Sequence, residues 1–287
     1  MLSFLSNFAQ ASGPELHVAP GGVFEIGGWT ITNSILYGWI ISLLVIIMLL
    51  VVARRVRVKP SGGFVQYVEF GVEFIRDLVE GAFDDKKVAR KYVPYFVTLF
   101  FFILLNTWFG LLPIVGEGFK AGSIPLLRPF TGDWNGTFAM AAVTMGFVYV
   151  SSVRESGGIG KYLRHFFVGS PLNPLYLVIG LLEMFSDLTR VLSLSIRLFL
   201  NVAIGEMVIA VFAYLGHFAA PLTAAPFTLI EFGIGALQSY IFVILGIMYL
   251  AVAVNHSQQH EADGTDLTDD TQPETISSEA ATGSANG

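Results

Sequence analysis

The chain has 287 residues, of which 54% are apolar and only 13% are charged, about half the charged share of an average soluble protein. A soluble domain of this length would need a charged, solvated surface. The composition therefore excludes an ordinary cytosolic enzyme and indicates an all-α polytopic membrane protein. The chain has no cysteine, which excludes disulfides, thiolate metal sites and a cysteine nucleophile. No Lys or Arg precedes Arg54, so the basic start of a cleavable signal peptide is missing.

Five apolar stretches predict five membrane-embedded helices. They are residues 35–53, 93–112, 138–150, 175–218 and 222–254. The first two are long enough to cross a bilayer, at roughly 20 residues per span. The third is short unless the whole of 134–153 is included. The last two exceed the length of a perpendicular span, so each is either a helix with an extension or a strongly tilted helix.

The distribution of basic residues predicts the orientation of the chain. Nine of the 16 Lys and Arg residues lie between Arg54 and Lys91, and the loop after the third stretch carries three more. The loop between the second and third stretches has only Lys120 and Arg128. By the positive-inside rule, the two basic loops are cytoplasmic and the N-terminus is outside. Five crossings then place the C-terminus in the cytoplasm.

The segment 64–83 predicts an amphipathic helix within the first basic loop. Apolar and small residues recur there at helical spacing, and acidic residues with one arginine fill the other positions. This pattern is typical of a helix on the cytoplasmic membrane surface or against a partner. A small soluble helix packed on the loops fits it equally well.

From Glu261 onward the chain has seven acidic residues and no Lys or Arg, which predicts a disordered cytoplasmic tail because such a segment cannot bury a core. The predicted organisation is an extracytoplasmic segment at 1–34, a first transmembrane helix at 35–53, a basic cytoplasmic loop at 54–92, a membrane domain at 93–256 and an acidic tail at 257–287.

Polar residues within the last two apolar stretches are the most informative feature of the sequence. A charge inside a bilayer costs roughly 2.5–3.5 kcal/mol on insertion scales, and such residues commonly mark functional sites. The two stretches nevertheless contain Glu183, Asp187, Arg190, Arg197, Asn201, Glu206, His217, Glu231 and Gln238. Asp187 and Arg190 are three residues apart, which indicates a local structural pair.

Arg197 has no acidic residue three or four positions away that could pair with it. Because an arginine stays charged in a protein, it must face a water-filled cavity or a carboxylate supplied from elsewhere. The structural alternative is an ion pair with Glu231 on the neighbouring helix.

Helical geometry places the remaining polar residues relative to Arg197. Asn201 and Glu183 share its face, whereas Glu206 is turned aside and lies about 13 Å further along the axis. Glu231 and Gln238 share a face of the following helix. Carboxylates at different depths around one permanent charge indicate a proton path that the arginine interrupts, because burial can bring carboxyl groups into a range where they exchange protons.

Two other classes of function fit the sequence less well than this path. A secondary transporter that binds a substrate carboxylate at Arg197 would show broken helices and an internal repeat, and neither is evident. A membrane enzyme would need a catalytic constellation, but the chain has no HExxH, GxSxG or P-loop motif. The residues alone thus lead to a polytopic protein with an intramembrane proton or ion path.

Several motifs resemble subunit a of F-type ATP synthases over about residues 20–256. They are SLSIRLFLNVAIGE at 193–206, LIEFGIGALQSYIFVIL at 229–245, NTWFGLLP at 106–113, the T-x-D-x-N-x-T element within 130–144 and GGWTITNS at 27–34. This family is the membrane stator that conducts protons past the rotating c-ring. The resemblance implies a non-catalytic subunit of the bacterial plasma membrane that contacts the c-ring, the peripheral-stalk b subunits and lipid. It implies no cofactor, metal or nucleic acid.

The resemblance also implies roles for individual residues. Arg197 matches the essential arginine that faces the c-ring carboxylate and separates two half-channels. Glu206 and Glu231 match the acid and histidine pair of the outer half-channel, although both are Glu here. The positions with further implied contributions are Asn201 and Gln238 near the arginine, Glu183 in the cytoplasmic half-channel, and Asn106 on the second span. Asp187 and His217 are further candidates from their position alone, with a local pair with Arg190 and a surface histidine as the alternative interpretations.

This chain departs from the family pattern at two positions. Leu200 stands where the motif usually has Gly, and Val191 stands where Pro often follows the basic residue. The extra bulk of Leu200 predicts different local packing against the ring, but neither change removes a titratable group. The family further implies that the last two helices lie strongly tilted along the ring.

Overall fold

The computed structural model describes the backbone of residues 22–26, 29–55, 63–112, 120–121, 124–125, 128–155, 174–216 and 219–269. Side chains at 23–29, 120–125, 256–269 and much of 174–187 lie outside the description. The helices are α2 (Asn33–Arg55), α3 (Phe64–Ala82), α4 (Lys86–Gly110), α5 (Trp134–Glu155), α7 (Pro174–Gly216) and α8 (Ala220–Asp269), with the 3-10 turn η1 (Phe130–Gly132). Two short antiparallel hairpins, β1 (Gly22–Ile26) with β2 (Trp29–Thr32) and β3 (Lys120–Ala121) with β4 (Ile124–Pro125), complete the described part.

Five of the described helices, α2, α4, α5, α7 and α8, are long and apolar enough to cross a membrane. The predicted all-α polytopic fold is thereby confirmed. The third span is the longer version, since α5 covers the whole of 134–155.

Two predicted boundaries differ from the structure. The second span begins at Lys86 rather than at 93, because the Asp85 side chain accepts a hydrogen bond from the Lys87 N–H at 2.8 Å and caps the helix. The last helix continues to Asp269, so residues 261–269 of the predicted disordered tail have a helical backbone. A helix pairs its own backbone groups and can therefore run beyond its last packed residue.

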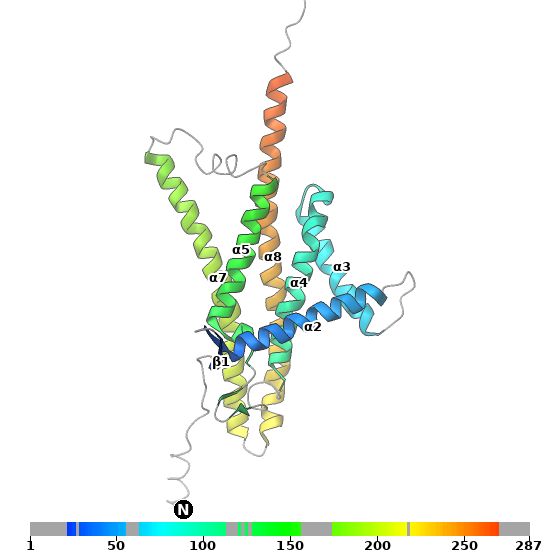
Figure 1. Ribbon diagram of the computed structural model, residues 1–287, viewed down its shortest axis with the longest axis vertical. Helices are drawn as coiled ribbons and strands as arrows, with labels where there is room; N and C mark the ends of the chain where they lie inside the picture. Colours follow the sequence, from blue (N-terminus) through cyan, green and yellow to red (C-terminus); the bar gives the residue numbers. More distant parts are fainter. Residues whose placement is uncertain are drawn as a thin grey trace, which may run out of the picture.

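The directions of α2, α7 and α8 constrain how far these helices tilt from the membrane normal. In Figure 1, α2 runs across the direction of α7 and α8. The 23 residues of α2 span about 35 Å, close to the hydrocarbon thickness, whereas the 43 residues of α7 span about 65 Å. Since crossing helices cannot both stand upright, an upright α2 requires α7 and α8 to be strongly tilted.

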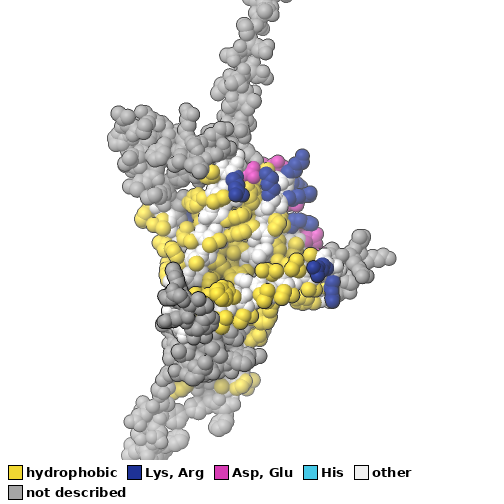
Figure 2. Space-filling view, in the orientation of Figure 1, with side chains coloured by type: hydrophobic (Ala, Val, Ile, Leu, Met, Phe, Trp, Pro, Cys, Tyr) yellow, Lys and Arg dark blue, Asp and Glu magenta, His cyan; other side chains and the backbone are white. Residues whose placement is uncertain are grey.

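The core lies where α4, α5, α7 and α8 meet. Phe96 and Phe242 are both buried there, and Gly246 admits the Phe96 ring. Outside this core, large apolar side chains are exposed along most helices, and Figure 2 shows them as a broad hydrophobic surface with Lys and Arg confined to its margin. This arrangement suits a bundle surrounded by lipid.

Helix α3 buries one stripe of apolar residues and exposes another. Val68, Ile75 and Val79 are buried, and α3 packs mainly on α4. Phe64, which shares their helical spacing in the sequence, is 67% exposed. It belongs to a second, exposed stripe that also contains Tyr67 and Phe70. The helix is therefore both packed on the bundle and apolar toward its surroundings.

Buried hydrogen bonds fix η1 beside α2, α4 and α5. The Asn106 side-chain oxygen accepts bonds from the Thr131 N–H and hydroxyl, each at 3.3 Å. The Ser34 hydroxyl at the start of α2 donates to the buried Asp133 carboxylate at 2.8 Å. These bonds matter for the site because η1 lies against α7.

The contact of α3 with α4 gives a stability prediction. A Cβ on Gly71 would lie 2.9 Å from the Phe101 ring, whereas a Cβ on Gly81 of the same helix meets nothing within 4 Å. Gly71→Leu should destabilise the subunit by about 1–3 kcal/mol through overpacking. Gly81→Leu provides the same gain in helix propensity and should not destabilise the subunit, because the added side chain meets no neighbour. Equal aggregation temperatures of the two variants in the solubilised complex would contradict this packing.

Candidate functional site

A cavity of about 440 Å³ opens between α7 and α8. The two helices form a hairpin whose turn is held by a bond from the Thr223 hydroxyl to the Phe212 carbonyl at 2.8 Å. Phe212 and Phe227 stack with ring centroids 3.8 Å apart, and Phe227 lines the cavity. Most of the lining is apolar, so its few polar groups define what the cavity can do.

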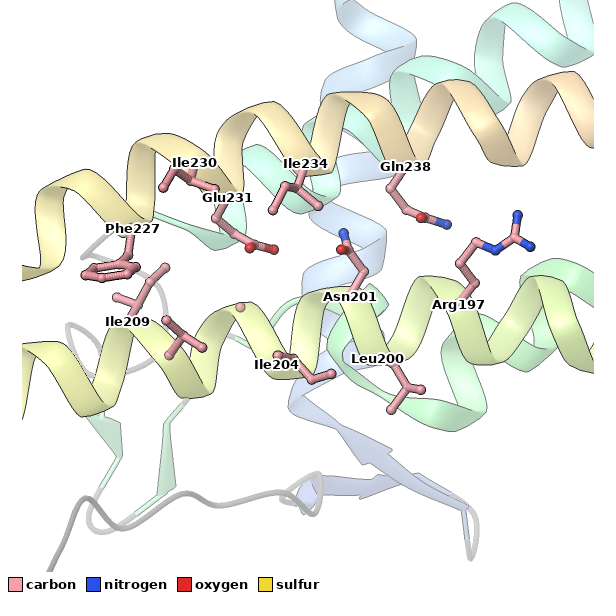
Figure 3. Close-up of a pocket in the computed structure, with 12 residues that line it drawn as sticks. Arg197, Leu200, Asn201, Ile204, Ile209, Phe227, Ile230, Glu231, Ile234 and Gln238 are labelled. Atoms are coloured by element: carbon pink, nitrogen blue, oxygen red, sulfur yellow. The ribbon is translucent and has the colours of Figure 1, made fainter.

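Four of the residues predicted from the sequence line this cavity together. Arg197 and Asn201 come from α7, and Glu231 and Gln238 come from α8. Figure 3 shows these side chains directed into the space between the two helices. The helical spacings in the sequence thus place them correctly, one turn apart on α7 and two turns apart on α8.

Arg197 is exposed at the cavity and makes no ion pair or hydrogen bond with any described residue. The structural alternative, a pair with Glu231, is not formed. Glu231 is buried, and its Oε1 atom has no hydrogen-bond partner among the described residues. The Asn201 amide nitrogen also lacks one. Because unpaired buried polar groups are costly, these atoms need water or a ligand in the cavity.

The Glu231 carboxylate lies directly on the backbone of α7. A Cβ added to Gly205 would collide with that carboxylate. Only glycine therefore leaves room for the Glu231 carboxylate in this position. Gly205 immediately precedes Glu206, and adjacent residues of a helix point about 100° apart, so the two carboxylates lie at different faces of one short piece of α7.

Glu206 faces away from the cavity, as its helical position predicts. Its carboxylate lies against Gly132 of η1, where an added Cβ would be 3.5 Å from Oε1 and 3.8 Å from Oε2. Arg128 and Glu231 are the charged groups that act on it electrostatically. Two carboxylates thus lie beside the same turn of α7. Glu231 comes from α8 and lines the cavity, whereas Glu206 belongs to α7 and lies outside it.

Asn106 does not reach the cavity. Its side-chain oxygen holds η1, its Nδ2 atom has no partner among the described residues, and its backbone carbonyl accepts the Tyr37 hydroxyl at 3.2 Å. Its place in the fold is to support the turn that touches Glu206.

The comparisons with known proteins agree with this geometry. The family model described as ATP synthase A chain matches residues 35–251. The chain belongs to this family.

Its similarity to curated members extends over most of the chain. It is 33% identical to ATP synthase subunit a of Moorella thermoacetica over 239 residues, which cover 82% of this chain and 96% of that protein. It is 30% identical to ATP synthase subunit a of Anaeromyxobacter dehalogenans, over 80% of this chain and 60% of that protein. It is 28% identical to ATP synthase subunit a of Myxococcus xanthus, over 83% of this chain and 77% of that protein. The chain is thus a multi-pass membrane subunit of the ATP synthase subunit a family, the proton-translocating subunit of the membrane sector.

Three residues predicted for the site of this family member lie outside the described side chains. They are Glu183, Asp187 and His217, so their placement stays a prediction. Arg190, predicted to pair with Asp187, lies over the Tyr249 ring with its Cζ atom 5.1 Å from the centroid. This contact ties α7 to α8.

Sequence reasoning missed Gly205, Gly132, Arg128 and Tyr37. No motif or spacing in the sequence marks these residues. Tertiary packing decides which side chain lies against a glycine and which group a loop arginine contacts. The nearest signal is that Arg128 is one of only two basic residues in the loop between the second and third predicted spans.

The approach of Glu231 to Gly205 gives a direct test. Gly205→Ala should displace the Glu231 carboxylate and lower ATP-driven proton pumping by the assembled complex about tenfold or more, because small misplacements of such groups are costly. Gly233→Ala is the matched control, since a Cβ there meets nothing within 4 Å. Both variants are assayed by acidification of inverted vesicles. Normal pumping by Gly205→Ala would show that the position of Glu231 is not critical.

Proposed function

We propose that this chain is the stator that carries protons to and from the carboxylates of a rotating c-ring. Arg197 separates an outer and an inner half-channel and thereby couples proton flow to rotation and ATP synthesis. The observation that carries this proposal is Arg197 itself, a permanent cation that lines a mostly apolar cavity and has no ionic partner among the described residues. Such a charge needs water or an anionic partner, and in this proposal a second protein supplies the anion.

The surface around Arg197 supports a protein partner that brings that anion. Ile196, Leu200 and Ile204 are 40–54% exposed on α7, and Figure 3 shows Leu200 turned away from α8. An apolar helix face with a cation in it fits an apolar partner helix with a single carboxylate. The c-ring is the partner of this chemistry that family membership implies.

The two carboxylates on either side of Gly205 support an outer proton path. A carboxyl group can take up and release a proton, whereas Arg197 cannot relay one. In the proposed path Glu206 and Glu231 pass protons toward the ring, and Asn201 and Gln238 provide polar contacts near Arg197. Glu183 is proposed for the inner half-channel, with lesser roles for Asp187 and His217. Asn106 is proposed to act through η1.

A secondary transporter with a substrate site at Arg197 is the weaker alternative. No described observation favours it, and family membership gives this chain a place in a larger complex. Like the family, it is proposed to be non-catalytic and to contact the peripheral-stalk b subunits.

We further propose that the protein lies in a bacterial plasma membrane with its N-terminus outside and its C-terminus in the cytoplasm. The described Lys and Arg residues support this, since most lie where α2 and α5 end and where α4 begins, as Figure 2 shows for the visible face.

The absence of cysteine makes the orientation simple to test. Arg154→Cys at the exposed end of α5 should react with an impermeant maleimide only from the cytoplasmic side. Asn135→Cys, exposed at the start of the same helix, should react only from outside. Labelling is compared in inverted and right-side-out vesicles. The reverse pattern would overturn the proposed orientation.

The role of Arg197 is tested in inverted vesicles that carry the assembled complex. Arg197→Ala should abolish ATP-driven acidification, with or without an added passive proton leak under an imposed potential, because the barrier between the half-channels loses its charge. Arg190→Ala, seven residues earlier on α7, is the matched arginine control and should keep pumping. Unchanged pumping by Arg197→Ala in an intact complex would make Arg197 a structural charge and refute the proposed function.

A further inference from the structure

The Glu206 carboxylate lies outside the α7–α8 cavity, in a small enclosure made by other parts of the chain. Gly132 of η1 lies against it, and Val202 of α7 borders the same spot, 3.7 Å from the position of a Gly132 Cβ. Tyr37 of α2 is buried and interacts electrostatically with Glu206. Anything that exchanges a proton with Glu206 from this side meets η1 and α2 first.

Arg128 shares a neighbour with Glu206. Its Nη2 atom donates a hydrogen bond to the Gly132 carbonyl at 3.1 Å, and Gly132 is the residue on which the Glu206 carboxylate rests. The guanidinium and the carboxylate therefore both lie next to the same residue. The turn that contains it is anchored by buried bonds of Asn106 and Asp133.

We propose that Arg128 is a positioning residue for Glu206: anchored on the Gly132 carbonyl, its charge sets the pH range in which Glu206 exchanges protons with the extracytoplasmic side. This inference rests on the proposed function, since it presumes that Glu206 carries protons. It adds a cation of the extracytoplasmic loop as the second determinant of the outer path, distinct from Arg197.

The other groups that face Glu206 do not replace this charge. Glu231 approaches from α8 with a like charge, and Tyr37 from α2 is neutral unless it loses its proton. Asp133, next to Gly132, is engaged by the Ser34 hydroxyl and by the Asn135 N–H at 3.1 Å. Arg128 is the cation that acts on Glu206 among the described residues.

The test measures proton uptake from the extracytoplasmic side of the intact complex. Inverted vesicles are loaded with buffers of different internal pH, and ATP synthesis is driven by a potassium diffusion potential that is held constant. A neighbouring cation favours the ionised form of a carboxyl group. Arg128→Gln should therefore raise the internal pH of half-maximal synthesis by about one unit, whereas Arg128→Lys should keep the wild-type profile.

Arg154→Gln removes the same charge at the far end of α5 and is the matched control. A rate that falls equally at every pH in Arg128→Gln would mean that Arg128 only braces the turn, and would overturn the proposal. An equal shift in Arg128→Lys would overturn it too, because something other than charge would be acting.

Two further variants separate this inference from the proposed function. Arg197→Ala and Glu206→Gln should each abolish synthesis at every internal pH. If both keep normal rates, the proposed function itself fails. If both lose synthesis while Arg128→Gln shows no shift, only the role of Arg128 is refuted.

Discussion

A positive charge that cannot be removed, on a helix with an apolar exterior, is the constraint on which the rest of this structure depends. Arg197 stays ionised under any physiological condition, and no described residue of its own chain neutralises it. A bilayer disfavours such a group by several kcal/mol at the least. The hairpin of α7 and α8 holds a cavity into which Arg197 projects together with three other polar side chains. The apolar flank of α7 is the surface that the proposed function assigns to a partner, and the unpaired atoms of Glu231 and Asn201 lie within the described hairpin.

Glycines let side chains of one helix lie directly on the backbone of the next. The Glu231 carboxylate of α8 lies on Gly205 of α7, and the Thr107 side chain of α4 lies on Gly235 of α8. The cavity between α7 and α8 thus stands beside close contacts of α8 with both α7 and α4. Gly132 of η1 lies likewise against the Glu206 carboxylate, and η1 and the adjoining Asp133 are anchored by buried bonds to α4 and α2.

The sequence predicts the helices well because membrane spans satisfy their own backbone bonds, so their apolar runs are read directly. It predicts that Arg197, Asn201, Glu231 and Gln238 meet, because helical periodicity and a single hairpin are enough to bring them together. It does not predict that Asp85 starts α4 seven residues early, nor that α8 runs on to Asp269. It also does not reveal the enclosure around Glu206, because Arg128, Gly132 and Tyr37 come from separate elements whose meeting depends on the tertiary fold. The sequence also does not reveal which apolar residues of α3 are buried, because the same pattern includes residues packed on the bundle and residues that are exposed.

The crossing of α2 over α7 and α8 has a consequence for how the membrane voltage acts on this protein. If α2 stands upright, the step of about 13 Å along α7 from Arg197 to Glu206 runs largely parallel to the bilayer plane. Charge that moves between these two positions then crosses little of the electric field. In the proposed function, the voltage then acts on the entry and exit of protons, and successive residues of α7 face successive positions around the proposed ring. A long tilted helix thus keeps Arg197 and Glu206 at similar depths although they are nine residues apart.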